Sequence, residues 1–115
     1  MSQDCIFCKI AAGEIGGPPV YQDNDITAFK DLNPQAPTHI LIIPNKHITS
    51  VSNAADEDQM LLGKLMLTAA KVASQEGLAD NGYRLVINTG AHGGQTVFHL
   101  HVHLLGGRNM VWPPG

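Results

Sequence analysis

Three histidines alternate with apolar residues near the end of this chain, in the run His-Leu-His-Val-His-Leu-Leu over residues 99–105. Side chains of a β-strand point to its two faces in turn, so this spacing predicts the rings of His99, His101 and His103 on one face. The apolar side chains between them would point into a core. Because imidazole is largely neutral at physiological pH, these rings can act as nucleophiles or as metal ligands.

Two of the three uses open to such a face are less favoured by the sequence. A merely solvated edge strand would be served equally well by serine, threonine or lysine. In a metal site, neighbouring rings could share one ion, but the outer two would lie about 13 Å apart at roughly 3.3 Å per residue. One ion is therefore not expected to bind all three, and no carboxylate partner for a two-histidine iron site is evident.

Nucleophilic catalysis is the use that we expect for this face. His101, the middle ring, would attack, and His103 would hydrogen-bond a phosphate oxygen or the leaving group. The preceding residues 93–96, Gly-Gly-Gln-Thr, offer backbone N–H groups and a hydroxyl that can hold a phosphate without lysine or Mg²⁺. The sequence therefore predicts attack by His101 on a phosphate group.

Five strands and two helices are expected to position these residues. The strands are predicted from β-prone runs bounded by turn residues, at 20–22, 26–29, 39–43, 83–88 and 97–105. Asp23-Asn24-Asp25 is typical of a hairpin turn between the first two strands. The run at 39–43 is predicted to be a central strand, and residues 89–94 a flexible loop.

The helices are predicted from apolar side chains spaced three and four residues apart. Cys5 to Ala12 should form a short helix, and Asp56 to Glu76 a long one that begins with a capping box of Asp56 and Gln59 and ends at Gly77. Strand pairs with a long helix before the last two predict an α+β fold, in which a mostly antiparallel sheet packs on that helix.

The composition predicts one domain over residues 1–115, since the chain is too short for two. It has 7 Lys and Arg against 10 Asp and Glu with no basic run, so we expect no nucleic-acid partner. No apolar stretch approaches the length of a membrane span and no signal peptide is evident, so we expect no membrane partner and a cytoplasmic location. The second sheet face needs a cover, which favours a homodimer.

The histidine run resembles the histidine-triad (HIT) pattern. Residues 94–96 before it, and Leu-Gly-Gly-Arg at 105–108 and Trp-Pro-Pro-Gly at 112–115 after it, are similar to the histidine-triad nucleotide-binding (Hint) branch. The similarity continues through Asp-Leu-Asn-Pro at 31–34 and Pro-Thr-His at 37–39 to the N-terminal helix. It implies a homodimeric HIT-like protein that cleaves the P–N bond of purine nucleoside 5′-monophosphoramidates, derived from AMP or GMP, through a covalent nucleotidyl-histidine intermediate.

The resemblance also implies a role for each site residue. His101 is the nucleophile, His103 contacts the phosphate, His99 orients the neighbouring ring, and His39 buttresses the triad. Gln95 and Thr96 hold the phosphate and assist the departing amine, Asn88 binds phosphate or ribose, and Asp31 and Leu32 hold the ribose and the edge of the base pocket. The catalytic set is His101, His103, His99, His39 and Thr96, and the nucleotide-binding set is Asp31, Leu32, Asn88, Gly94, Gln95, Thr96, His101 and His103.

Cys5 and Cys8 are the two cysteines of the chain, and a Cys-x-x-Cys pair in an intracellular protein suggests metal or redox chemistry. Related nucleotidyl transferases and some bacterial triad proteins hold a structural zinc with such a pair and two histidines. The corresponding ligands here are Cys5, Cys8, His47 and His99, and the alternative is two reduced thiols without a metal. Zinc would be structural and catalysis would require no cofactor, since the chemistry needs His101 free.

Three other functions remain open from the sequence. Members that split dinucleoside polyphosphates typically follow the triad with Pro-Arg, where this chain has Leu-Gly-Gly-Arg. A nucleotide-binding regulatory module with incidental turnover would not need an intact nucleophile, and a metal-storage protein would bind metal without nucleotide. The sequence leaves open the base preference and the natural amine.

Overall fold

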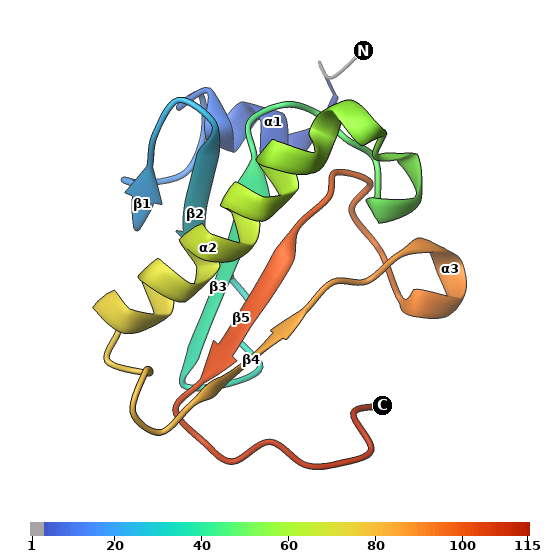
Figure 1. Ribbon diagram of the computed structural model, residues 1–115. Helices are drawn as coiled ribbons and strands as arrows, with labels where there is room; N and C mark the ends of the chain where they lie inside the picture. The colour runs from blue at the N-terminus through green and yellow to red at the C-terminus, as the bar shows by residue number, and fades with distance from the viewer. Residues whose placement is uncertain (1–3) are drawn as a thin grey trace.

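The computed structural model describes residues 4–115, which form one five-stranded antiparallel sheet in the order β1-β2-β3-β5-β4 (Figure 1). The strands are β1 (Tyr21–Gln22), β2 (Ile26–Lys30), β3 (Thr38–Pro44), β4 (Tyr83–Val86) and β5 (Val102–Gly106). The helices are α1 (Ile6–Ala11), α2 (Gln59–Gln75) and α3 (Gly90–Gly93), with 3₁₀ turns at Val51–Asn53 and Asp56–Asp58. This architecture confirms the predicted α+β fold, with β3 at the centre of the sheet.

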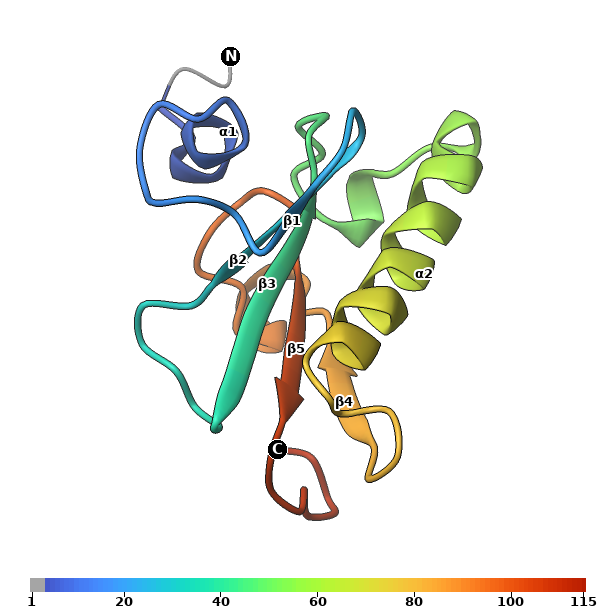
Figure 2. The same cartoon turned by 90° about the vertical axis from the view of Figure 1, so that its left-hand side faces the viewer.

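The two faces of the sheet are covered by different helices, and α1 and α2 lie on opposite sides of it (Figure 2). On one face, Ile40, Ile42, Val102 and Leu104 pack in the main core. Side chains of α2 complete that core, among them Leu65, Ala69, Val72 and Ala73. On the other face, Leu41 and Ile43 of β3 pack with Phe7 of α1.

The register of the sheet sets which polar side chains accompany α1 on its face. Leu41 lies opposite His103, and His39 lies opposite Leu105. Because α1 is short, it covers only part of this face. The remaining part of the face is available for a functional site.

The last strand is shorter than predicted, because β5 begins at Val102 and not at residue 97. Its neighbour β3 ends in Pro44, which has no N–H to donate to a further ladder. Two other contacts hold the preceding residues in place. The N–H of Leu100 donates to the carbonyl of Ile48 at 2.7 Å, and His99 Nε2 lies 2.8 Å from the Pro44 carbonyl oxygen.

The loop predicted at 89–94 contains one helical turn, α3, so that prediction was wrong. The Gln95 side chain stabilises this turn, since its Oε1 accepts the N–H of Gly90 at 3.0 Å. Gly94 ends the turn with φ of 82°, a conformation that favours glycine. Strand β4 correspondingly ends at Val86, two residues earlier than predicted.

The long helix α2 begins at Gln59 and not at Asp56 as predicted, because Asp56–Asp58 forms a 3₁₀ turn before it. The capping contact lies in that turn and involves a different acidic residue from the one predicted. Asp58, rather than Asp56, accepts the backbone N–H of Ala55 at 2.9 Å, and Lys46 Nζ lies 2.6 Å from the same carboxylate. Gly77, with φ of 79°, ends the helix as predicted. Within residues 4–115 no helix is long and apolar enough to cross a membrane.

Candidate active site

His101 is held with one defined nitrogen protonated. Its Nδ1 lies 2.7 Å from the main-chain carbonyl oxygen of His99. Because a carbonyl oxygen only accepts hydrogen bonds, Nδ1 must carry the proton and donate. Nε2 therefore keeps its lone pair. The ring is nearly buried, and the edge-to-face contact with Phe7 of α1, at 5.1 Å between centroids, restricts its orientation.

A chain of hydrogen bonds fixes the opposite arrangement in His103. The backbone N–H of Gln35 donates to His39 Nδ1 at 3.0 Å, so His39 carries its proton on Nε2. That Nε2 lies 2.9 Å from His103 Nδ1 and donates to it. His103 consequently carries its own proton on Nε2. The site thus presents a lone pair on His101 and an N–H donor on His103.

The surroundings of these rings favour the neutral forms that the hydrogen bonds require. Burial, together with the nearby His101 and His39 rings, lowers the pKa of His103 to about 4. Burial also lowers the pKa of His39, although the carboxylate of Asp31, 3.4 Å from His39 Nε2, opposes this effect. Both rings are therefore neutral near pH 7.

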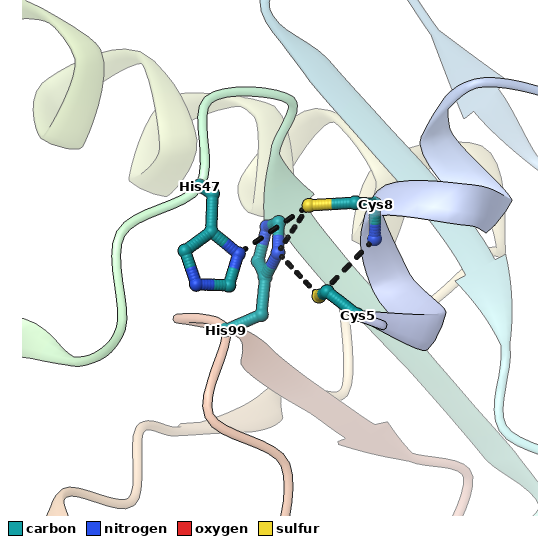
Figure 3. Close-up of side chains that lie close together, drawn as sticks. All are labelled: Cys5, Cys8, His47 and His99. Atoms are coloured by element: carbon teal, nitrogen blue, oxygen red, sulfur yellow. Dashed lines mark hydrogen bonds between the residues drawn. The ribbon is translucent and has the colours of Figure 1, made fainter. Parts of the chain in front are cut away.

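His99 faces a separate cluster of side chains. Its Nε2 donates to the Pro44 carbonyl, so the lone pair is on Nδ1, and burial lowers the pKa of this ring. Nδ1 lies 3.2 Å from Cys5 Sγ and 3.4 Å from Cys8 Sγ. Cys8 Sγ also lies 3.3 Å from His47 Nδ1. Figure 3 shows these four side chains converging from α1, the segment after β3 and the segment before β5.

The cluster fits a tetrahedral zinc ion. The four ligand atoms all lie within 4.8 Å of one another. In a tetrahedral zinc site, bonds of about 2.3 Å to sulfur and about 2.0 Å to nitrogen place a sulfur and a nitrogen ligand roughly 3.6 Å apart. The distances from the cysteine Sγ atoms to the histidine Nδ1 atoms are close to this value. Asp31, His39 and His103 also lie close together. His39, however, uses both ring nitrogens in hydrogen bonds, so this second group is not a ligand set.

A pocket of about 820 Å³ opens beside His101 and His103, which both line it. Asp31, Leu32 and Thr96, for which the sequence predicts nucleotide binding, contribute to the same lining. The apolar part of the lining includes Ile6, Phe7, Ile10, Phe29 and Leu41. This volume is in the range of small-molecule sites, and it combines a flat apolar wall with a few polar groups.

The other predicted site residues lie outside this lining. His39 is buried and contacts His103, which agrees with a buttressing position. The Gln95 carboxamide bonds the N–H of Gly90 and the carbonyls of Thr49 and Val97, so it has little capacity left for a phosphate. Asn88 and Gly94 are absent from the described residues that line the pocket. His99 orients His101 through its main-chain carbonyl.

The wall that α1 provides to the pocket was not predicted from the sequence. Ile6 and Ile10 contribute to the apolar pattern that predicted this helix, and Ile6 nevertheless stays half exposed. The pattern identifies a buried helical face, but it does not distinguish a face that packs in a core from one that borders a ligand pocket.

Comparison with known proteins finds similar proteins of one family. A family model described as HIT domain matches residues 12–110. The purine nucleoside phosphoramidase of Escherichia coli K12 is 55% identical over 108 residues, which are 94% of this chain and 91% of that protein. An uncharacterised HIT-like protein of Synechococcus elongatus is 56% identical over 115 residues, the full length of both.

Solved structures agree with this fold. A HIT family hydrolase from Legionella pneumophila superimposes with a TM-score of 0.94 and 54% identity, covering 97% of this chain and 100% of that one. A histidine triad nucleotide-binding protein from Candida albicans gives a TM-score of 0.81 and 31% identity, covering 96% and 83%.

Proposed function

Because this chain belongs to the HIT family, we propose that it is a purine nucleoside phosphoramidase, cleaving the P–N bond of AMP and GMP phosphoramidates. One observation carries the proposal. The His99 carbonyl holds the proton of His101 on Nδ1, which leaves the Nε2 lone pair beside a pocket of nucleotide size. The E. coli purine nucleoside phosphoramidase is 55% identical to this chain over the matched region.

The geometry supports a two-step reaction. His101 Nε2 attacks the α-phosphorus, the P–N bond breaks, and the electron pair of that bond leaves with the amine, which takes up a proton. The His103 Nε2–H is placed to donate to a phosphate oxygen or to the departing nitrogen, and Thr96 offers a hydroxyl. Water then attacks the nucleotidyl-histidine, which releases the nucleoside monophosphate and restores the neutral ring.

The pocket lining supports a position for the rest of the nucleotide. Asp31 offers carboxylate oxygens to ribose hydroxyls, and Phe7, Ile10 and Phe29 offer apolar surface to a base. These side chains make few directional contacts with a base edge, so we expect adenine and guanine to be accepted alike.

We further propose that Cys5, Cys8, His47 and His99 bind a structural zinc ion, supported by their mutual distances and donor types. When bound, zinc supplies a fixed tetrahedral anchor between α1 and the catalytic segment. Catalysis does not pass through it. The metal content of the purified protein tests this, with one zinc per chain expected in the parent protein and a loss in Cys8→Ser.

A homodimer is also part of the proposal. Strand β4 is an edge of the sheet, with β5 as its one neighbour, and an edge strand presents unpaired backbone groups. The segments before and after β5 carry exposed apolar side chains, among them Phe98 and Trp112. Light scattering should give twice the mass of one chain, and the mass of a single chain would contradict the dimer.

The activity is tested by release of AMP from adenosine 5′-phosphoramidate, with and without a chelator. We expect turnover by the parent protein in both conditions and its loss in His101→Ala. If folded parent protein binds AMP but releases none from the phosphoramidate, the protein is a nucleotide-binding module instead. Faster cleavage of a dinucleoside polyphosphate would indicate the other HIT activity.

A further inference from the structure

The two thiols at the start of α1 lie within reach of one another. Cys5 and Cys8 are both half-buried, and their sulfur atoms are within 4.8 Å. A disulfide requires the sulfurs to approach to about 2.05 Å, which a small adjustment of this short segment can provide. The sequence pattern Cys-x-x-Cys suggests redox chemistry as well as metal binding.

The thiols are connected to the nucleophile through one residue. Both sulfurs lie beside His99 Nδ1, at 3.2 and 3.4 Å. The carbonyl of the same residue accepts the His101 Nδ1–H at 2.7 Å. A change in what occupies the sulfurs therefore acts on the residue that orients the nucleophile.

The same helix connects the thiols to the nucleotide pocket. Phe7, between the two cysteines, packs edge-to-face against His99 and His101, with centroids 6.0 and 5.1 Å away. It also lines the pocket, with Ile6 and Ile10 of the same helix. Because Cys5 and Cys8 flank Phe7 in sequence, a bond between their sulfurs constrains the segment that carries this wall.

We propose that Cys5 and Cys8 form a reversible thiol–disulfide modification site that lowers the affinity of the adjacent pocket for nucleotides. The inference rests on the nucleotide site of the proposed function. The reduced pair supports binding of metal and nucleotide, and the disulfide removes both sulfurs from His47 and His99. Bound metal and disulfide exclude one another, so metal protects the reduced state.

The oxidant is a small-molecule disulfide such as oxidised glutathione. One cysteine thiolate attacks it, which forms a mixed disulfide and expels one glutathione thiolate. The second cysteine then attacks the protein sulfur of that mixed disulfide and expels the second glutathione. The protein loses two electrons and two protons, and the two released glutathione molecules gain them.

The experiment treats the reduced full chain with oxidised glutathione, after removal of metal with a chelator. Peptide mass analysis reports the Cys5–Cys8 bond, and calorimetry reports the affinity for AMP. We expect the disulfide to form, the affinity to fall at least about fivefold, a typical size for coupling between sites, and dithiothreitol to restore it. One equivalent of Zn²⁺ added beforehand should slow formation of the bond.

The matched control is the double variant Cys5→Ser, Cys8→Ser, whose affinity for AMP should not respond to the oxidant. Failure to form the disulfide, an unchanged affinity in the disulfide form, or an equal loss in the double variant would each overturn the inference. Turnover of a phosphoramidate by the reduced protein is measured separately. Such turnover without sensitivity to oxidation would leave the proposed function intact and remove only this inference.

Discussion

At the scale of single residues, backbone groups decide which nitrogen of each histidine carries a proton. The Pro44 carbonyl fixes His99, the His99 carbonyl fixes His101, and the Gln35 N–H fixes His39 and, through it, His103. Neighbouring rings therefore differ in chemistry although their residue type is the same. One presents a lone pair and the next an N–H group.

The role of His39 follows from this arrangement. His39→Leu removes the donor to His103 Nδ1, so His103 no longer keeps its proton on Nε2. We expect kcat for a phosphoramidate to fall about tenfold or more, with the affinity for AMP little changed. Steady-state kinetics and calorimetry measure the two effects. In His39→Gln the amide can still donate, so that variant should recover much of the rate, and equal losses in both variants would contradict a positioning role.

The lowered pKa values of His103 and His39 predict a loss of stability in acid. Their pKa values are lower in the folded protein than the usual value near 6.5, so the unfolded chain binds more protons as the pH falls below about 6.5. The stabilisation is complete above that pH and is lost toward pH 4. Thermal unfolding at pH 7, 6 and 5 measures it. His103→Asn should show a smaller decrease, and an identical decrease would contradict this assignment.

At the scale of secondary structure, α1 serves the pocket and the cysteine cluster together. Phe7 is 6% exposed and contacts the rings of His99 and His101. Phe7→Ala should lower the free energy of unfolding by about 3 kcal/mol and weaken AMP binding. Met60→Ala, at a side chain that is 88% exposed on α2, is the control and should change neither. Chemical denaturation and calorimetry provide the values, and unchanged AMP binding in Phe7→Ala would exclude α1 from the nucleotide site.

Most of the helices and strands could be predicted from the sequence. Apolar periodicity located β3, α1 and α2, and the alternation of histidines placed His101 and His103 opposite the main core. The predicted start of β5 was wrong, because Pro44 of the neighbouring strand β3 ends the pairing of the two strands there. The turn α3 and the position of Gln95 were missed, because a side chain that bonds the backbone of Gly90 and Thr49 leaves no periodic pattern.

At the scale of the whole molecule, the cysteine and histidine cluster joins three segments that are distant in the sequence. Cys5 caps the start of α1 and Cys8 lies within it, while His47 follows β3 and His99 precedes β5. A ligand that binds only the folded state stabilises it in proportion to the logarithm of its concentration relative to its Kd. Removing zinc with a chelator should therefore lower the melting temperature of the parent protein.

The control for metal removal is the same treatment of the Cys5→Ser, Cys8→Ser variant, in which the chelator should have no effect. A parent protein whose melting temperature does not respond to chelator or to added Zn²⁺ would contradict the metal proposal.

Residues 4–115 form the sheet and the helices that cover its two faces. A single domain over residues 1–115 stays a prediction, because its first three residues lie outside the described structure.

Rapid-quench mass analysis during turnover of adenosine 5′-phosphoramidate tests whether His101 is the nucleophile. We expect an adenylyl group on the peptide that contains His101, attached to Nε2, in an amount that decays as AMP appears. The adduct should be absent in His101→Ala. Turnover without any adduct, or an adduct on another residue, would contradict attack by His101.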